Sequence, residues 1–111
     1  MNKLDRTLAE ISSRKNKRIP ALMTHVVLGY PTMAASIDLV CAMADGGASM
    51  IELQIPFSDP MADGPTIMEA NEAALRQGVK VKDCMHAAEK LSRKVDVPLI
   101  FMSYANILLS Y

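Results

Sequence analysis

Three carboxylates lie in and just after one of the most apolar stretches of the chain, 52-ELQIPFSDPMADGPTI-67. Glu52 sits between two large aliphatic residues, and Asp59 and Asp63 follow it. A carboxyl group in apolar surroundings has a raised pKa, because burial disfavours its charged form. Such a group can hold a proton near neutral pH and deliver it, while a carboxylate in a wetter loop stays ionised. Glu52 and Asp63 are therefore candidates for divided acid and base roles.

The same carboxylates also have structural interpretations, which stay open at this point. Asp59 and Asp63 could organise their loop through turn hydrogen bonds to backbone N–H groups. Asp63 could instead cap the helix that Pro65 begins. Glu52 could be a core glutamate satisfied by a neighbour, although a buried glutamate is rare unless it is paired. Spacing alone does not decide between the functional and structural interpretations.

The apolar pattern predicts helices alternating with strands, and these elements would position the acids. Apolar runs predict strands within 21–31, 49–57 and 97–105, and helical spacing predicts helices over 3–15, 32–45, 65–77 and 80–94, with another beginning at 106. This order predicts parallel strands joined by right-handed crossovers. In such α/β folds the carboxyl ends of the strands and the loops after them form the active face. Glu52 on the second strand and Asp63 in the following loop can therefore reach the same mouth.

Composition narrows the class of protein. The chain has 111 residues, half of them hydrophobic, which suits one small domain with a real core. Its 12 basic and 12 acidic residues balance, which argues against a nucleic-acid groove or an anionic membrane surface as the main partner. The N-terminus lacks an apolar signal-peptide core, and no apolar run could span a bilayer. Cys41 and Cys84 lie far apart on apolar helical stripes, which favours free buried thiols over a disulfide or metal pair. We expect a cytoplasmic protein.

The segment from Glu52 to Ile67 resembles a segment of the tryptophan synthase alpha subunit family, Glu-Leu-Gly-[Ile/Val]-Pro-Phe-Ser-Asp-Pro-x-Ala-Asp-Gly-Pro-x-Ile. Two further blocks agree with that family: 28-LGYPT-32 resembles the turn after its first strand, and 102-MSYAN-106 resembles the end of its third strand. The resemblance covers essentially the whole chain in the right order. It implies a (β/α)8 barrel, of which residues 1–111 would be the N-terminal portion: a single domain with the first three β/α units and an N-terminal helix.

The resemblance also implies an activity and a partner. The family cleaves indole-3-glycerol phosphate to indole and glyceraldehyde 3-phosphate, a retro-aldol step of tryptophan biosynthesis. It uses no metal or organic cofactor in this half-reaction. The indole passes to a partner β subunit that carries pyridoxal phosphate, within an α2β2 assembly.

Residue roles follow from the matched positions. Glu52 matches the family's acid–base glutamate, and Asp63 matches the aspartate that hydrogen-bonds the indole N–H. Leu28 falls near the pocket, and Tyr104 matches an aromatic residue beside the substrate ring. Three residues match loop positions near the contact with the β subunit: Pro56, Asp59 and Asn106.

The chain departs from the family pattern at two positions near the candidate acids. His25 stands where an apolar residue is common, and we interpret it as a core or pocket-wall residue rather than a catalytic one. Gln54 replaces a glycine and could crowd Glu52 or hydrogen-bond to it.

Length is a further departure, because a barrel of this type needs about 250 residues and the loops that grip the substrate phosphate would lie beyond the third strand. We therefore expect 1–111 to be part of a longer polypeptide, and we expect self-association and little turnover if it is complete. Two functions compete: a carbon–carbon lyase or its N-terminal part, and a catalytically silent piece that docks on a β subunit. Another phosphate-binding barrel lyase is a weaker third possibility.

Overall fold

A computed structural model describes residues 2–15, 20–58 and 63–110 of the chain. Its elements are α1 (Lys3–Ser13), β1 (Met23–Val27), α2 (Met33–Asp45), β2 (Met50–Gln54), α3 (Pro65–Arg76), α4 (Val81–Lys94), β3 (Leu99–Met102) and α5 (Ala105–Ser110). The order of helices and strands predicted from the apolar pattern is confirmed. Each strand fills only part of its apolar run, because the runs continue into the turns that follow the strands.

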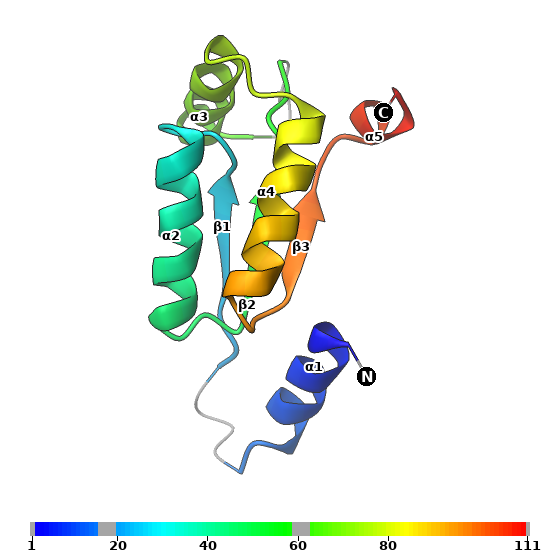
Figure 1. Ribbon diagram of the computed structural model, residues 1–111. Coiled ribbons are helices and arrows are strands. Elements are labelled where there is room, and N and C mark those ends of the chain that lie inside the picture. The colour runs from blue at the N-terminus through cyan, green and yellow to red at the C-terminus, as the bar shows by residue number, and fades with distance from the viewer. Residues whose placement is uncertain (1, 16–19, 59–62, 111) are drawn as a thin grey trace.

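The three strands form one parallel sheet in the order β1-β2-β3. In register, His25 pairs with Glu52, which pairs with Ile100 on β3. Figure 1 shows the strands pointing the same way, with α2 and α4 covering one face of the sheet, α3 at the carboxyl ends of the strands and α1 beyond their amino ends. The carboxyl end of the sheet is therefore the end at which the loop after β2 meets α3.

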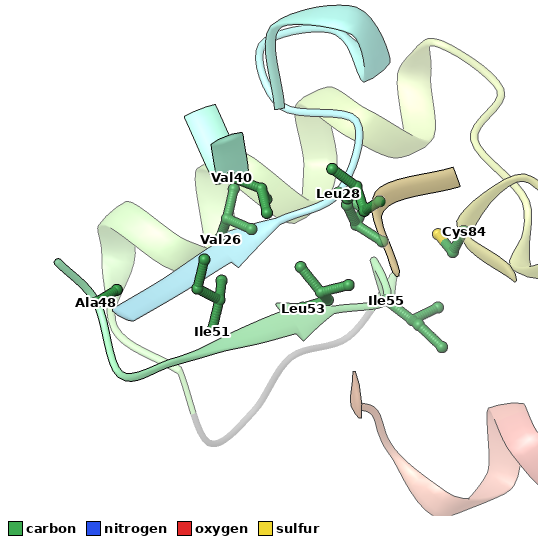
Figure 2. Close-up of a cluster of buried hydrophobic side chains, with 9 residues drawn as sticks. Val26, Leu28, Val40, Ala48, Ile51, Leu53, Ile55 and Cys84 are labelled. Atoms are coloured by element: carbon green, nitrogen blue, oxygen red, sulfur yellow. The ribbon is translucent and has the colours of Figure 1, made fainter. Parts of the chain in front are cut away.

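The hydrophobic core lies between the sheet and helices α2 and α4. Its buried members come from all these elements and the turns beside them, as Figure 2 shows for most of them: Val26, Leu28, Val40, Ala48, Ile51, Leu53, Ile55, Cys84 and Leu91. Successive side chains of a strand point to opposite faces. Because Ile51 and Leu53 point into this core, Glu52 and Gln54 must project from the other side of β2. We call that side, which also carries His25 and Val27 of β1, the second face.

Local signals at the helix ends account for where α2 and α3 begin. The Thr32 hydroxyl accepts a hydrogen bond from the N–H of Ala35 at 3.0 Å and so caps the amino end of α2. Pro65 occupies the first turn of α3, as predicted. Asp63 does not cap this helix, because the N-cap residue is Gly64 and no side chain caps it. That structural interpretation of Asp63 is therefore corrected.

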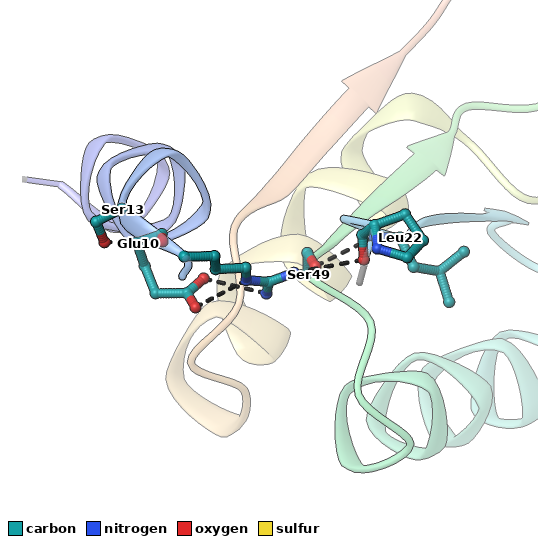
Figure 3. Close-up of polar contacts among 6 residues, drawn as sticks. Glu10, Ser13, Leu22 and Ser49 are labelled. Atoms are coloured by element: carbon teal, nitrogen blue, oxygen red, sulfur yellow. Dashed lines mark hydrogen bonds and ion pairs between the residues drawn. The ribbon is translucent and has the colours of Figure 1, made fainter. Parts of the chain in front are cut away.

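Polar groups of helix α1 contact the rest of the chain. The Lys3 ammonium donates to the carbonyl oxygens of Ser92, at 2.5 Å, and Val95, at 2.8 Å, at the end of α4. Figure 3 shows the ion pair between Glu10 and Arg14, whose closest atoms are 2.9 Å apart. No residue of α1 is buried, so the apolar side chains of this helix are at most partly covered within the described chain.

Figure 3 also shows a contact between the segments that lead into the first two strands. The N–H of Leu22, just before β1, donates to the hydroxyl of Ser49, just before β2, at 3.2 Å. This contact continues the pairing of the two strands beyond their amino ends.

Within the described residues no helix is long and apolar enough to cross a membrane.

Candidate active site

Glu52 lies on the second face of the sheet, two residue pairs before the β1–β2 register ends. Its side chain is half-buried, with a quarter of its surface exposed. The carboxylate oxygen Oε1 lies 2.7 Å from Nδ1 of His25, the residue that pairs with Glu52 in the register. The expected neighbour that satisfies a partly buried glutamate is therefore a histidine on the adjacent strand.

Asp63 is connected to the same face through Gln54. The Gln54 amide donates to the Asp63 carboxylate at 3.1 Å and lies 3.4 Å from the side-chain oxygen of Asn71. Gln54 is almost completely buried, with 1% of its surface exposed. Sequence analysis raised the possibility of a hydrogen bond from Gln54 to Glu52, and the structure corrects this: the amide reaches forward to the loop aspartate. Glu52 and Gln54 lie two residues apart on β2 and therefore project from the same face. One acid, Glu52, belongs to this strand, and the other, Asp63, is hydrogen-bonded to it through Gln54.

Asn71 of α3 anchors the loop that carries Asp63. Its side-chain oxygen accepts from the N–H of Phe57 at 2.8 Å, and its amide donates to the carbonyl of Ile67 at 2.8 Å. The side chain is fully buried. A buried amide with its donor and acceptor both used fixes the segment after β2 against α3.

Tyr104 lies beside the same group of residues at the carboxyl end of β3. Its ring packs on that of Phe57 with centroids 4.5 Å apart and planes tilted by 34°. Tyr104 also lines a small cavity of about 120 Å³ together with Gln54, Met102 and Ser103. The structure thus brings Tyr104 to the residue that holds Asp63.

The other predicted site residues are placed differently. Leu28 is fully buried in the core beneath α2 and α4, because its position after β1 continues the alternation that turns Val26 toward the helices. It presents no side-chain surface to the second face. Pro56 is buried within the chain and Asn106 is exposed, while Asp59 falls outside the described residues. Contact of these three with a partner subunit stays a prediction.

Two side chains contribute to the site in ways that the sequence did not predict. Asn71 was not singled out, although a polar residue between the alanines of an apolar helix face was a usable signal. The sequence indicates a core or pocket-wall residue at His25, but its pairing with Glu52 depends on strand register, which the sequence alone does not fix.

The side chains of the site offer a half-buried carboxylate, an imidazole and a hydrogen-bonded aspartate, which suit proton transfer and hydrogen bonding. Among the described residues, no group of three or more His, Cys, Asp or Glu side chains could hold a metal ion. Both cysteines are free, as predicted; Cys84 is also buried as predicted, whereas Cys41 is only half-buried.

Comparison with known proteins gives a consistent result. Residues 11–111 match the family profile described as tryptophan synthase alpha chain. The chain is 50% identical over 90 residues to the tryptophan synthase alpha chain of Syntrophotalea carbinolica, covering 81% of this chain and 36% of that protein. It is 47% identical over 103 residues to that of Desulforapulum autotrophicum, covering 93% of this chain and 41% of that protein.

Solved structures agree with the sequence matches. The tryptophan synthase subunit alpha from Legionella pneumophila superposes with a TM-score of 0.91 at 32% identity, over 100% of this chain and 42% of that one. A tryptophan synthase chain from M. tuberculosis gives 0.85 at 37% identity, over 96% and 42%. The described elements therefore form part of a (β/α)8 barrel. The chain spans about two fifths of the length of these relatives.

Proposed function

The chain belongs to the tryptophan synthase alpha chain family, and on that premise we propose that it supplies the acid–base glutamate and the indole-binding aspartate for cleavage of indole-3-glycerol phosphate. The reaction is a retro-aldol scission to indole and glyceraldehyde 3-phosphate. The observation that carries the proposal is that Glu52 and Gln54, the latter holding Asp63, project from one strand onto one face at the carboxyl end of a parallel sheet.

Glu52 is assigned the proton transfers. For the bond between indole C3 and the glycerol carbon to break, C3 must gain a proton and the neighbouring glycerol hydroxyl must lose one. The electron pair of the broken bond then stays with the indole, and the hydroxyl carbon becomes the aldehyde of glyceraldehyde 3-phosphate. A carboxyl group that is half-buried and held by one neighbour is suited to give and take these protons in turn.

Asp63 is assigned to the indole N–H. Positive character develops on the ring nitrogen when C3 is protonated, and a fixed carboxylate stabilises that charge. Gln54 and Asn71 support this assignment, because a carboxylate already hydrogen-bonded in place needs little rearrangement when charge develops. Tyr104, beside Gln54, is positioned to line the ring pocket.

The assembly implied by the family completes the proposal. The indole product would pass to a β subunit that carries pyridoxal phosphate, in an α2β2 assembly of the cytoplasm, with Pro56, Asp59 and Asn106 near the contact. The phosphate of the substrate would be gripped by strands and loops that lie beyond the three β/α units described here. This chain's own residues need no cofactor for the proton transfers assigned to them.

The competing function is a docking piece that binds a β subunit without cleaving anything. The test uses a completed chain, in which this chain is followed by the part of the Syntrophotalea carbinolica protein that lies beyond its match. We expect the completed chain to release indole from indole-3-glycerol phosphate without a β subunit, and faster with one. A completed chain that folds and alters β-subunit activity, but releases no indole in either assay, would establish the docking function instead.

A further inference from the structure

His25 and Glu52 form a close pair between adjacent strands of the second face. The Nδ1···Oε1 distance of 2.7 Å is at the short end of the range for a hydrogen bond to a charged oxygen. Their side chains are 29% and 25% exposed, so the pair is shielded but not sealed from solvent. Parallel pairing sets the two residues directly opposite each other, which fixes the contact by register.

The chemistry of the two groups determines where the imidazole hydrogen lies. When Glu52 is ionised, its carboxylate only accepts hydrogen bonds, so Nδ1 then carries a hydrogen and donates it. The other ring nitrogen, Nε2, is buried and has no partner among the described residues. Within the described part of the chain, Glu52 is therefore the hydrogen-bond partner that orients the ring.

From the side of Glu52, the same contact restrains one of its two carboxylate oxygens. Within the described residues, His25 is the one side chain that hydrogen-bonds Glu52. A glutamate on a strand would otherwise explore several rotamers, and this contact selects one of them. Oε2 is then the oxygen left for a substrate.

We propose that His25 is a positioning residue for Glu52: it holds Oε1 and thereby aims Oε2 at the atoms that exchange protons. This inference rests on the proposed function, since it acts through Glu52. A purely structural role for His25 would stabilise the β1–β2 pair and leave turnover by the folded protein unchanged. Replacing His25 should therefore lower kcat if it is a positioning residue, and should lower only stability if its role is purely structural.

The kinetic test compares two variants in the completed chain. His25→Phe keeps a ring of similar size but has no donor, whereas His25→Asn places an amide N–H near the position of Nδ1. We expect His25→Phe to lower kcat about tenfold with little change in KM, and His25→Asn to retain kcat within about threefold. Thermal melts check that each variant is folded, and His25→Leu replaces the phenylalanine variant if that one does not fold.

Three outcomes would overturn the inference, and they are distinguishable from one another. If the completed chain releases indole and folded His25→Phe is as fast, the positioning role is wrong while the proposed function stands. If the completed chain itself is folded and inactive, the proposed function is wrong, and the positioning role of His25, which depends on that function, is wrong with it. Independently of turnover, a long-range 1H–15N spectrum of the 111-residue chain should show the hydrogen of His25 on Nδ1; a hydrogen on Nε2 alone would refute donation from His25 to Glu52.

Discussion

The two candidate acids differ in what surrounds their side chains. Glu52 is half-buried, and His25 holds one of its carboxylate oxygens. The second oxygen is left for a substrate. Asp63 accepts from Gln54, whose amide is in turn directed by the buried Asn71. One acid is thus restrained at a single point and the other belongs to a network, which suits a proton carrier and a fixed charge respectively.

Cys84 provides a pH-dependent test of the core at the scale of a single residue. Burial raises the pKa of the Cys84 thiol from its usual 9.0 to about 12. Below pH 9 the thiol is neutral in both folded and unfolded chains. Above pH 9 the Cys84 thiol ionises in the unfolded chain before it does so in the folded chain. The contribution of Cys84 to the free energy of unfolding therefore falls as the pH rises toward 12. Urea unfolding at about pH 8 and about pH 10 should therefore show the parent losing stability relative to Cys84→Ala.

The control for this experiment is Cys41→Ala, which leaves Cys84 in place and should keep the alkaline loss. Other groups also titrate in this range, so the informative quantity is the difference between parent and variant at each pH. A difference between the parent and Cys84→Ala that stays constant from the lower to the higher pH would contradict the burial argument.

At this scale, the sequence identified the acids better than their partners. Glu52 and Asp63 could be singled out because charges are unexpected in an apolar run. The contact from Gln54 to Asp63 could not, because it depends on how the loop after β2 folds back over the end of its own strand. Leu28 was assigned to the pocket from its position alone, and its side-chain direction instead sends it into the core.

At the scale of elements, the turn after β1 joins the sheet to two helices. Gly29 has φ +94°, and its N–H donates to the Ser36 hydroxyl at the start of α2 at 3.1 Å. A Cβ atom added at Gly29 would lie 2.6 Å from Cγ2 of Val79, in the segment between α3 and α4. The turn therefore requires glycine both for its backbone conformation and for the close approach of Val79.

The costs of the backbone conformation and of the close approach of Val79 can be measured separately if Gly29 is compared with a second glycine, Gly47. Gly47 has φ +102°, and a Cβ there would meet nothing within 4 Å. Gly47→Ala should cost about 1–2 kcal/mol of unfolding free energy from backbone strain alone. Gly29→Ala should cost clearly more, because overpacking adds to the same strain. Urea unfolding of both variants measures the difference; equal losses would show that Val79 moves aside freely.

The elements themselves were largely predictable, and their exact ends were not. Thr32 and Pro65 mark helix starts through local chemistry that the sequence shows directly. Strand ends depend on pairing with a neighbour: the apolar run 97–105 continues past Met102, where pairing with β2 ceases. Apolar runs therefore indicate that a strand exists more reliably than where it stops.

At the scale of the whole molecule, the sheet has two outer strands. Within the described residues, β1 and β3 each pair with β2 and with no other strand. The matched relatives are more than twice as long as this chain, and the fold they share is a barrel in which each strand has two neighbours. The free edges of β1 and β3 are accordingly where the remaining strands of a barrel would join.

The most direct test of the central claim, that this chain carries the glutamate responsible for cleavage, is indole release after strand complementation. The 111-residue chain is mixed with a separate polypeptide that bears the remaining strands of the Syntrophotalea carbinolica protein, and indole formed from indole-3-glycerol phosphate is measured. The mixture containing the parent chain should release indole, and the mixture containing Glu52→Gln should form the same folded complex, bind the substrate and release none. A well-folded parent complex without indole release, or a Glu52→Gln complex that releases it as fast as the parent, would contradict the account.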